Sequence, residues 1–416
     1  MSRETLWILN HYAQTPLTAG GTRHYELARR LIGMGYDVSI VSSEFDHVSG
    51  TARFGGLSTP RCEVVDGVRF LWLPSRFSYR DNGMARVWNM LEYSVRAYWR
   101  GRKCFGGSLG KPDVLLASSP HLLTGLAGLR LARHFDIPFL FEVRDLWPET
   151  FVQMGVMTRR HPVVLLLRRL ELHLYRRSAK VVSLLPTVGE YLEPLGVESQ
   201  KTAIIPNGVD AEAYACEGSR REEGPLRIVY AGAHGPANGL DNVLRAMAEL
   251  AGNLEVEFHS YGDGPEKATL TALARELELA NVFFHGAVPK CEIPAILCGA
   301  DALLLNYARL GIGAYGISPN KLWEYLAAGK PVLFAHEATN NPVEELDCGI
   351  SVPPADPAAL AHAVRLLAAM TPQERLVMGA RGVGYVREEH DWGVLAGKLD
   401  SLIRDVLTPD TPEAMG

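Results

Sequence analysis

The stretch Ile317-Ser-Pro-Asn-Lys-Leu-Trp-Glu-Tyr-Leu-Ala-Ala-Gly-Lys-Pro-Val332 carries the pattern that decides the fold. Ser318 is a favourable N-cap residue and Pro319 suits the first helical position, so the stretch predicts a helix that begins there. Gly329 ends this helix, and the apolar residues 331–334 predict a strand. A helix that leads directly into a buried strand is the building unit of parallel sheets covered by helices.

The same alternation of short β-branched runs and longer helical patterns continues along the whole chain. Strands are predicted at residues 6–10, 37–42, 68–71, 114–118, 139–143 and 181–185, and again at 227–231, 256–260, 282–285, 302–305 and 331–334. This rhythm predicts an α/β fold with parallel sheets. Because it restarts after residue 220, we expect two domains, residues 1–205 and 206–390. Residues 391–416 are expected to form a C-terminal helix that crosses back to the first domain.

The composition is that of a globular protein with an uneven distribution of charge. Of 416 residues, 47% are hydrophobic and 21% are charged, which excludes disordered and fibrous classes. No apolar run has the length needed to cross a bilayer, and the N-terminus has no signal-peptide pattern. Residues 1–205 carry an excess of 8 positive charges, whereas residues 206–416 carry an excess of 13 negative charges. The first half is therefore expected to face an anionic partner: nucleic acid, a membrane surface or a phosphorylated substrate.

The six cysteines show no CxxC pair and no zinc-ligand spacing. A chain of this length does not need disulfide bonds for stability, so we expect reduced cysteines and a cytoplasmic location.

Lys321 is the strongest candidate for binding an anion. It falls in the first helical turn, where the helix dipole disfavours a cation unless an anion is bound there as well. Glu324 lies one turn further on the same face and could accept hydrogen bonds from sugar hydroxyls. The alternative is a capped surface helix with an ordinary Lys321–Glu324 ion pair.

Glycine-rich turns follow three predicted strands. They contain Gly20 and Gly21, then Gly232 and Gly235, and finally Gly262 and Gly264. Each glycine could belong to a plain turn, and none of the turns has the GxGxxG spacing of dinucleotide-binding folds. Taken together at strand ends, they predict the rim of a ligand-binding cleft.

A charged cluster that includes Glu142, Arg144 and Asp145 ends another predicted strand, where open α/β sheets place ligand contacts. The alternative is a structural ion pair. His121 and His11 lie at strand-to-helix turns, where a lone histidine is more often structural than functional. The sequence contains no metal-binding motif, no GxSxG and no P-loop, which argues against a metalloenzyme, an α/β-hydrolase or a P-loop NTPase.

Residues 159–180 combine seven basic residues with the single acid Glu171, and their leucines recur at helical spacing. A basic amphipathic helix is typical of membrane-surface binding; the alternative is an ordinary solvated helix. A second basic cluster, Arg96 to Lys103, includes Tyr98 and Trp99. No nucleic-acid motif accompanies these clusters, so no nucleic-acid partner is expected.

Together these motifs resemble the family 4 glycosyltransferases of the GT-B fold, and within them the bacterial O-antigen and capsule branch that includes fucosamine transferases. The resemblance rests on Gly20-Gly21 with residues 29–38, on residues 142–149, 205–210 and 261–265, and on Ser318 to Val332. It implies two Rossmann-like domains that face each other across a cleft. It also implies hexosyl or N-acetylhexosaminyl transfer with retention from a nucleotide diphosphate sugar, which we expect to be UDP-linked, without a metal or cofactor.

The resemblance also assigns roles to residues. The donor is expected at Lys321, which contacts the diphosphate, and at Glu324, which binds the ribose. The other donor-binding candidates are Ser318, Asn320, Gly232, Gly235, Gly262 and Gly264. Asp145, Glu142 and His121 are the catalytic candidates. Gly20, Gly21 and Arg144 are the candidates for acceptor binding on the N-terminal domain.

This chain departs from the family pattern at three points. The first Glu of the family's Glu-x7-Glu motif is replaced by Gly316, and the second-domain glycine turn lacks the usual Arg and Lys. The residue before Asp145 is Arg144, where the family often has histidine. We expect a lipid-linked sugar acceptor at the inner membrane face, in surface polysaccharide synthesis. A nucleotide-sugar 2-epimerase of the same fold and a catalytically silent sugar-nucleotide-binding subunit are the rival interpretations.

Overall fold

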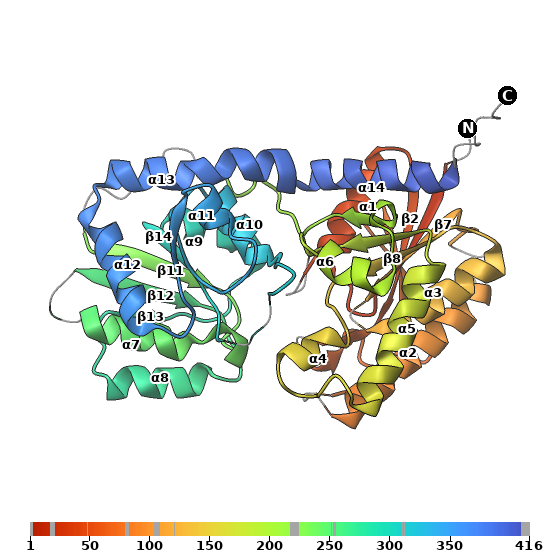
Figure 1. Ribbon diagram of the computed structural model, residues 1–416, viewed down its shortest axis with the longest axis horizontal. Coiled ribbons are helices and arrows are strands. Elements are labelled where there is room, and N and C mark those ends of the chain that lie inside the picture. The colour runs from red at the N-terminus through yellow and green to blue at the C-terminus, as the bar shows by residue number, and fades with distance from the viewer. Residues whose placement is uncertain are drawn as a thin grey trace. The chain divides into compact units, whose positions relative to one another are not determined.

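The computed structural model describes residues 3–16, 21–47, 49–79, 83–103, 109–119, 121–216, 224–250, 252, 255–309, 311 and 313–408. Contacts divide the chain into two compact units, Met1–Pro206 with Trp392–Gly416, and Asn207–Asp391. Each unit has a mainly parallel sheet covered by helices (Figure 1). The predicted α/β fold class is therefore confirmed.

The first unit is built on an eight-stranded sheet in the order β10-β9-β8-β7-β1-β2-β6-β5. Its strands are β1 (Thr5–Leu9), β2 (Asp37–Ser43), β5 (Arg61–Val65), β6 (Val68–Leu73), β7 (Val114–Ser119), β8 (Phe139–Val143), β9 (Lys180–Ser183) and β10 (Thr202–Ile204). β3 (Phe45–Asp46) and β4 (Thr51–Ala52) form a separate antiparallel pair. The edge strand β5 was not predicted: it pairs antiparallel with β6, and its charged, exposed residues hide the strand pattern.

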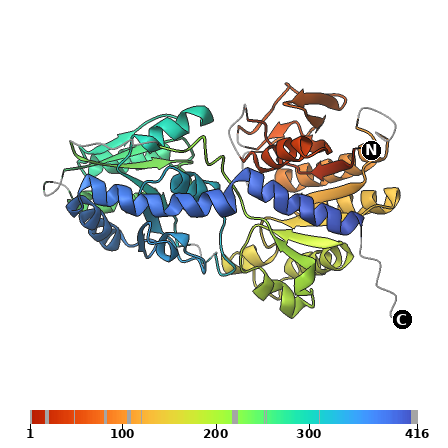
Figure 2. The same cartoon turned by 90° about the horizontal axis from the view of Figure 1, so that it is seen from above.

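Helices cover both faces of this sheet (Figure 2). α1 (Arg23–Gly33) and α14 (Trp392–Leu407) pack together on one face, where Leu31 and Leu399 share a core with Leu6 and Ile8 of β1. α2 (Met84–Lys103), α3 (Leu122–Phe135) and α5 (Pro162–Arg177) lie on the other face, as right-handed crossovers require. On that face the ring centroids of Trp7 and Phe135 lie 5.7 Å apart. The short helices are α4 (Glu149–Gln153), α6 (Gly189–Leu192), η1 (Glu193–Leu195) and η2 (Ser199–Lys201).

The second unit has a six-stranded parallel sheet in the order β13-β12-β11-β14-β15-β16. Its strands are β11 (Leu226–Ala231), β12 (Val256–Tyr261), β13 (Val282–Phe284), β14 (Ala302–Asn306), β15 (Val332–Ala335) and β16 (Gly349–Val352). Its helices are η3 (Pro236–Asn238), α7 (Leu240–Leu250), α8 (Lys267–Glu276), η4 (Lys290–Glu292), α9 (Ile293–Cys298), α10 (Asn320–Ala327), α11 (Pro342–Glu345), α12 (Pro357–Ala369), α13 (Pro372–Tyr385) and η5 (Val386–His390). β16 extends the sheet beyond the last strand that the sequence predicted.

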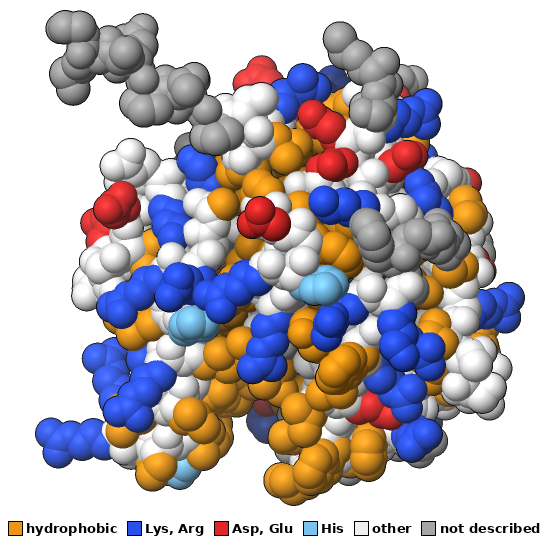
Figure 3. All heavy atoms as spheres, turned by 90° about the vertical axis from the view of Figure 1, so that its right-hand side faces the viewer, with side chains coloured by type: hydrophobic (Ala, Val, Ile, Leu, Met, Phe, Trp, Pro, Cys, Tyr) orange, Lys and Arg blue, Asp and Glu red, His pale blue; other side chains and the backbone are white. Residues whose placement is uncertain are grey.

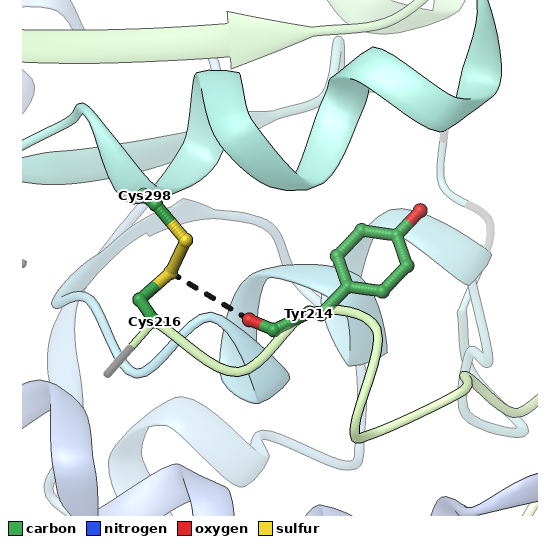
Figure 4. The surroundings of a disulfide bond; sticks show 3 residues. All are labelled: Tyr214, Cys216 and Cys298. Atoms are coloured by element: carbon green, nitrogen blue, oxygen red, sulfur yellow. Dashed lines mark hydrogen bonds between the residues drawn. A yellow bond between two sulfur atoms is a disulfide. The ribbon is translucent and has the colours of Figure 1, made fainter.

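A disulfide in the second unit corrects the expectation that all cysteines are reduced. Cys216 bonds to Cys298 at the end of α9 (Figure 4). The two residues are 82 positions apart, so sequence spacing gives no sign of the pairing. Among the described residues, Cys291 and Cys348 carry free thiols.

Candidate functional site

Lys321 lies in the first turn of α10 with its ammonium group held by neutral partners. Its Nζ donates to the hydroxyl of Tyr230 at 2.9 Å and to Oδ1 of Asn238 at 3.2 Å. The same atom lies 4.5 Å from the centre of the Tyr230 ring. Burial lowers the pKa of Lys321 to about 8, although the charge of Glu324 acts in the opposite direction. Because these hydrogen-bond partners carry no charge, the ammonium can still interact strongly with an anion.

The glycine turns after β11 and β12 come together beside this lysine. The amide of Gly232 donates to the carbonyl of Tyr261 at 2.9 Å. Gly264 has a φ of +157°, and a Cβ there would lie 2.5 Å from the carbonyl oxygen of His234. A Cβ at Gly232 would lie 2.5 Å from Cε of Lys321. Gly264 is thus required by its close approach to backbone, as is Gly262, whose Cβ would overlap the Gly232 carbonyl, whereas a side chain at Gly232 would displace the flexible end of Lys321.

Gly235 is different from these three glycines. Its φ is −119°, and the nearest atom to a Cβ there would be 4.0 Å away. Any side chain could adopt this backbone, so its predicted role in ligand approach has no support from the local geometry.

Ser318 does not cap the helix, which corrects the N-terminus predicted from the sequence. α10 begins at Asn320 after an extended Pro319, one residue later than predicted, without a side-chain cap. The Ser318 hydroxyl instead accepts hydrogen bonds from the Asn207 amide at 2.8 Å and from the Trp323 indole at 3.1 Å. Ser318 therefore fixes the loop that leads into α10. The Leu322 amide donates to the Pro319 carbonyl at 3.2 Å, and no side chain caps the amides of the first two helical residues.

Glu324 lies one turn after Lys321 and is largely covered, with 16% of its side chain exposed. Its Oε1 is 3.9 Å from Nζ of Lys290. The predicted alternative was an ordinary surface pair with Lys321, but the ion pair in the described structure is this long contact with Lys290. A loose partner leaves carboxylate lone pairs available for hydroxyl donors.

Tyr230, Asn238 and His234 belong to this site but were missed from the sequence. The His234 side chain is fully buried, and its Nε2 lies 2.6 Å from the Ser260 hydroxyl. Its Nδ1 is buried without a hydrogen-bond partner among the described residues. Burial and the charges of Lys267 and Lys321 lower the pKa of His234, so it is neutral near pH 7. The only sequence feature that could have identified Tyr230, His234 and Asn238 is that they lie in or directly before the glycine turn at Gly232.

In the first unit, Glu142 at the end of β8 is enclosed by its partners. Arg23 Nε donates to its Oε2 at 2.9 Å, Ser118 donates to its Oε1 at 2.8 Å, and His24 lies 3.0 Å away. The charges of Arg23 and His24 outweigh burial and hold the pKa of Glu142 well below its usual range. A buried, fully paired carboxylate is poorly suited to remove a proton, so this geometry favours the structural alternative for Glu142.

Asp145 is placed differently, because its side chain is exposed just beyond β8. Surrounding protein nevertheless restricts solvation of its carboxyl and raises its pKa, while Arg144 and Arg86 act in the opposite direction. Among the charged residues at the C-terminal end of β8, Asp145 is thus better suited than Glu142 to accept a proton. Arg86, on α2, was missed because it is far away in sequence and has no motif.

His121 precedes α3 in a buried histidine pair. Its Nε2 lies 2.9 Å from Nδ1 of His11, and the His11 ring stacks on Tyr12 with centroids 4.2 Å apart. Burial and the charge of Arg86 lower the pKa of His121 to about 3. A neutral imidazole in this network can orient a neighbouring group but does not supply a proton near pH 7. Gly21 lies just before α1, and Gly20 lies outside the described residues.

Two family models together match most of the chain. Residues 18–208 match the "Glycosyl transferase 4-like domain", and residues 225–370 match "Glycosyl transferases group 1". The chain belongs to the glycosyltransferases. The fucosamine transferase branch named from the sequence has no support beyond this family.

Two curated relatives have similar sequences to this glycosyltransferase. The "Probable glycosyltransferase WbjE" of Pseudomonas aeruginosa is 27% identical over 306 residues, which cover 68% of this chain and 71% of the relative. The "2-deoxystreptamine glucosyltransferase" of Streptomyces kanamyceticus is 30% identical over 222 residues, 50% of this chain and 55% of the relative.

Solved structures show the GT-B fold of the glycosyltransferase. Sucrose-phosphate synthase from Thermosynechococcus elongatus has a TM-score of 0.75 at 18% identity, covering 98% of this chain and 100% of its own. HepE of Anabaena, in complex with UDP and glucose, has a TM-score of 0.67 at 15% identity, covering 96% and 99%. WaaG, "a glycosyltransferase involved in lipopolysaccharide biosynthesis", has a TM-score of 0.65 at 14% identity, covering 97% and 100%. These likenesses establish the fold.

The described residues of the glycosyltransferase contain neither a membrane-spanning helix nor a cluster of metal ligands. None of their helices combines the length and apolar character needed to cross a bilayer. No group of three or more His, Cys, Asp or Glu side chains in the described part of the chain is arranged to hold a metal ion.

Proposed function

We propose that this protein transfers a sugar, with retention at the anomeric carbon, from a UDP-linked donor to a lipid-linked sugar acceptor in surface polysaccharide synthesis. The observation that carries the proposal is the Lys321 ammonium, held by Tyr230 and Asn238 over the Gly232 turn. A diphosphate is the ligand that uses both this charge and the N-terminus of α10, which no side chain caps.

The donor is proposed to lie across the second unit. Its diphosphate contacts Lys321 and the N-terminus of α10, and its ribose contacts Glu324. The close turns at Gly232, Gly262 and Gly264 leave backbone without side chains next to the ligand. The choice of UDP follows the HepE complex with UDP and glucose, and the choice of pathway follows WaaG.

The transfer is proposed to need no enzyme-bound intermediate. The acceptor hydroxyl oxygen forms the new bond to the anomeric carbon, while the bond from that carbon to the donor phosphate breaks on the same face of the sugar. The hydroxyl proton passes to the leaving phosphate oxygen, or to Asp145. Lys321 stabilises the negative charge that develops on the diphosphate, so we propose that no metal is needed for this purpose.

The basic helix α5 supports an acceptor at an anionic membrane surface. Arg169, Arg176 and Arg177 are exposed there, and each cation near an anionic leaflet contributes about 1 kcal/mol. Binding is therefore expected to favour anionic vesicles and to weaken as salt rises. The charge-removing variant Arg169→Gln/Arg176→Gln/Arg177→Gln should lose this salt-dependent part. Equal binding of wild type to neutral and anionic vesicles would contradict the proposal.

A donor screen tests the transfer itself. The protein is incubated with UDP-, GDP- and TDP-sugars, with and without membrane lipid extract, and products are followed by mass spectrometry and NMR. A sugar-extended lipid with an unchanged anomeric configuration is expected. An epimerised nucleotide sugar would support the 2-epimerase instead, and binding without any product would support the silent subunit suggested by Gly316.

A further inference from the structure

The outward side of α2 is apolar, which is the reverse of an ordinary surface helix. The exposed large hydrophobic residues on it follow helical spacing, with exposed fractions between 38% and 67%. They are Met84, Val87, Trp88, Leu91, Val95 and Trp99. From Met84 to Trp99, every residue of α2 in the exposed class is apolar. We call these six residues the α2 apolar face.

The α2 apolar face does not arise from a lack of core contacts elsewhere on the helix. The opposite side of α2 is already buried through Met90, Tyr93 and Ala97. Phe77, itself 41% exposed, stacks on Trp88 with ring centroids 6.3 Å apart and extends the surface. Contiguous exposed apolar surface that is not needed for the core is typical of an interaction site.

The charges around the α2 apolar face are basic. The helix carries five Arg and Lys residues and one acid, Glu92, which already pairs with Arg96 at 2.8 Å. Arg100, Arg102 and Lys103 end the helix, and its first turn has no acid. On α5, which like α2 packs against α3, Leu165 and Leu166 are 47% and 65% exposed. In the view of Figure 3, hydrophobic and basic side chains gather together toward the lower part of the face.

We propose that the α2 apolar face inserts into the interfacial region of an anionic lipid membrane, with Arg100, Arg102 and Lys103 at the phosphate level. Trp88 and Trp99 are suited to this depth, because the indole ring prefers the boundary between headgroups and acyl chains. This inference rests on the proposed lipid-linked acceptor and adds to it the helix that contacts the lipid. It does not depend on which sugar is transferred.

Charge favours a membrane over a second copy of the chain as the occupant. A symmetric dimer through the α2 apolar face would bring two basic helices together with no acid in the first turn to offset them. An anionic lipid surface instead supplies both an apolar interior and the opposite charge.

The tryptophans of this chain make the test specific. Trp7, Trp72, Trp323 and Trp392 are at most 5% exposed, and Trp147 is partly covered. Vesicles of phosphatidylcholine with phosphatidylglycerol should therefore shift the emission of Trp88 and Trp99 to the blue. Brominated lipids should quench it. The full-length protein is used, without donor or acceptor, so failure here is distinct from failure of the proposed transfer.

Variants separate insertion from attraction by charge alone. Trp88→Phe/Trp99→Phe keeps the apolar surface and should bind vesicles normally without the blue shift. Trp88→Gln/Trp99→Gln should lower vesicle partitioning by about tenfold or more at high salt, where charge is screened. Val64→Gln is the matched control: Val64 is 63% exposed on β5 of the same unit, and its loss should change nothing.

Two results would overturn the inference. One is a Trp88→Gln/Trp99→Gln protein with a normal melting temperature and unchanged partitioning. The other is a molecular mass in solution, measured without lipid, that doubles with concentration for wild type but not for this variant. That result would assign the α2 apolar face to contact with a second copy of the chain. Turnover on a water-soluble acceptor should be equal in all variants, because none of these residues belongs to the proposed catalytic site.

Discussion

The lowered pKa of Lys321 predicts that nucleotide binding weakens at alkaline pH. Burial brings this pKa to about 8, more than two units below that of an exposed lysine. Only the protonated amine attracts a diphosphate. The free protein must therefore carry a proton on Lys321 before it binds with full affinity, and the population able to do so falls as pH rises through about 8.

The size of the effect follows from the titration of one group. With a pKa of about 8, Lys321 is about 90% protonated at pH 7 and about 10% at pH 9. The dissociation constant for UDP should thus increase about tenfold over this range, which is about 1.4 kcal/mol. Burial raises the pKa of the neighbouring Tyr230 and lowers that of His234, so neither changes charge between pH 7 and 9.

Isothermal titration calorimetry with UDP at pH 6.5 to 9.5 measures this dependence. Lys321→Arg is the matched control, since arginine stays charged throughout and any titration of the nucleotide itself is common to both proteins. Lys321→Ala should bind more weakly by about 1.5–3 kcal/mol at pH 7 and lose the dependence. If wild type and Lys321→Arg weaken equally between pH 7 and 9, Lys321 is not the phosphate ligand.

Four further changes test other parts of the structure. Glu324→Gln should weaken donor binding while leaving the melting temperature nearly unchanged; a large loss of stability would instead show that its ion pair is structural. Asp145→Asn should lower turnover by about 10²–10⁴-fold with little change in UDP affinity, and normal turnover would assign the proton to the donor phosphate. Glu142→Gln should lower the free energy of unfolding by about 3–5 kcal/mol, since it leaves the buried Arg23 without its counter-charge, and chemical denaturation measures this. Cys216→Ser should lower it by about 2–4 kcal/mol under non-reducing conditions, and an unchanged midpoint would show that the bond does not form in solution.

The strand-helix rhythm was sufficient to predict most of the fold. Buried parallel strands are continuous apolar runs, so strands such as β8 were located to the residue. The strands that were missed lie at sheet edges. Arg61 and Glu63 of β5 are too polar to signal a strand, and β16 has only four residues, three of them partly exposed.

The candidate site was predictable only where local chemistry carries the signal. Lys321 was identified because a lysine in a first helical turn conflicts with the helix dipole, and such conflicts are expected at functional positions. Its partners Tyr230 and Asn238 lie 91 and 83 residues away. Nothing in the local sequence reports a contact of that range, and the same limit applies to Arg86 beside Asp145.

Net charge was informative about the first unit but could not say which of its basic residues face outward. Several are paired inside the unit: Arg23 with Glu142, Arg30 with Glu26 and Arg168 with Glu149. Each such pair removes one positive and one negative charge, so the excess is unchanged and must be carried by other residues. On α5 these are the exposed Arg169, Arg176 and Arg177.

The apolar side of α2 could not be recognised as exposed from the sequence, because its hydrophobic pattern is equally consistent with a buried face. Only the structure shows that Met90 and Tyr93 supply the core contacts, so that Trp88 and Trp99 are exposed, as the proposed membrane insertion requires.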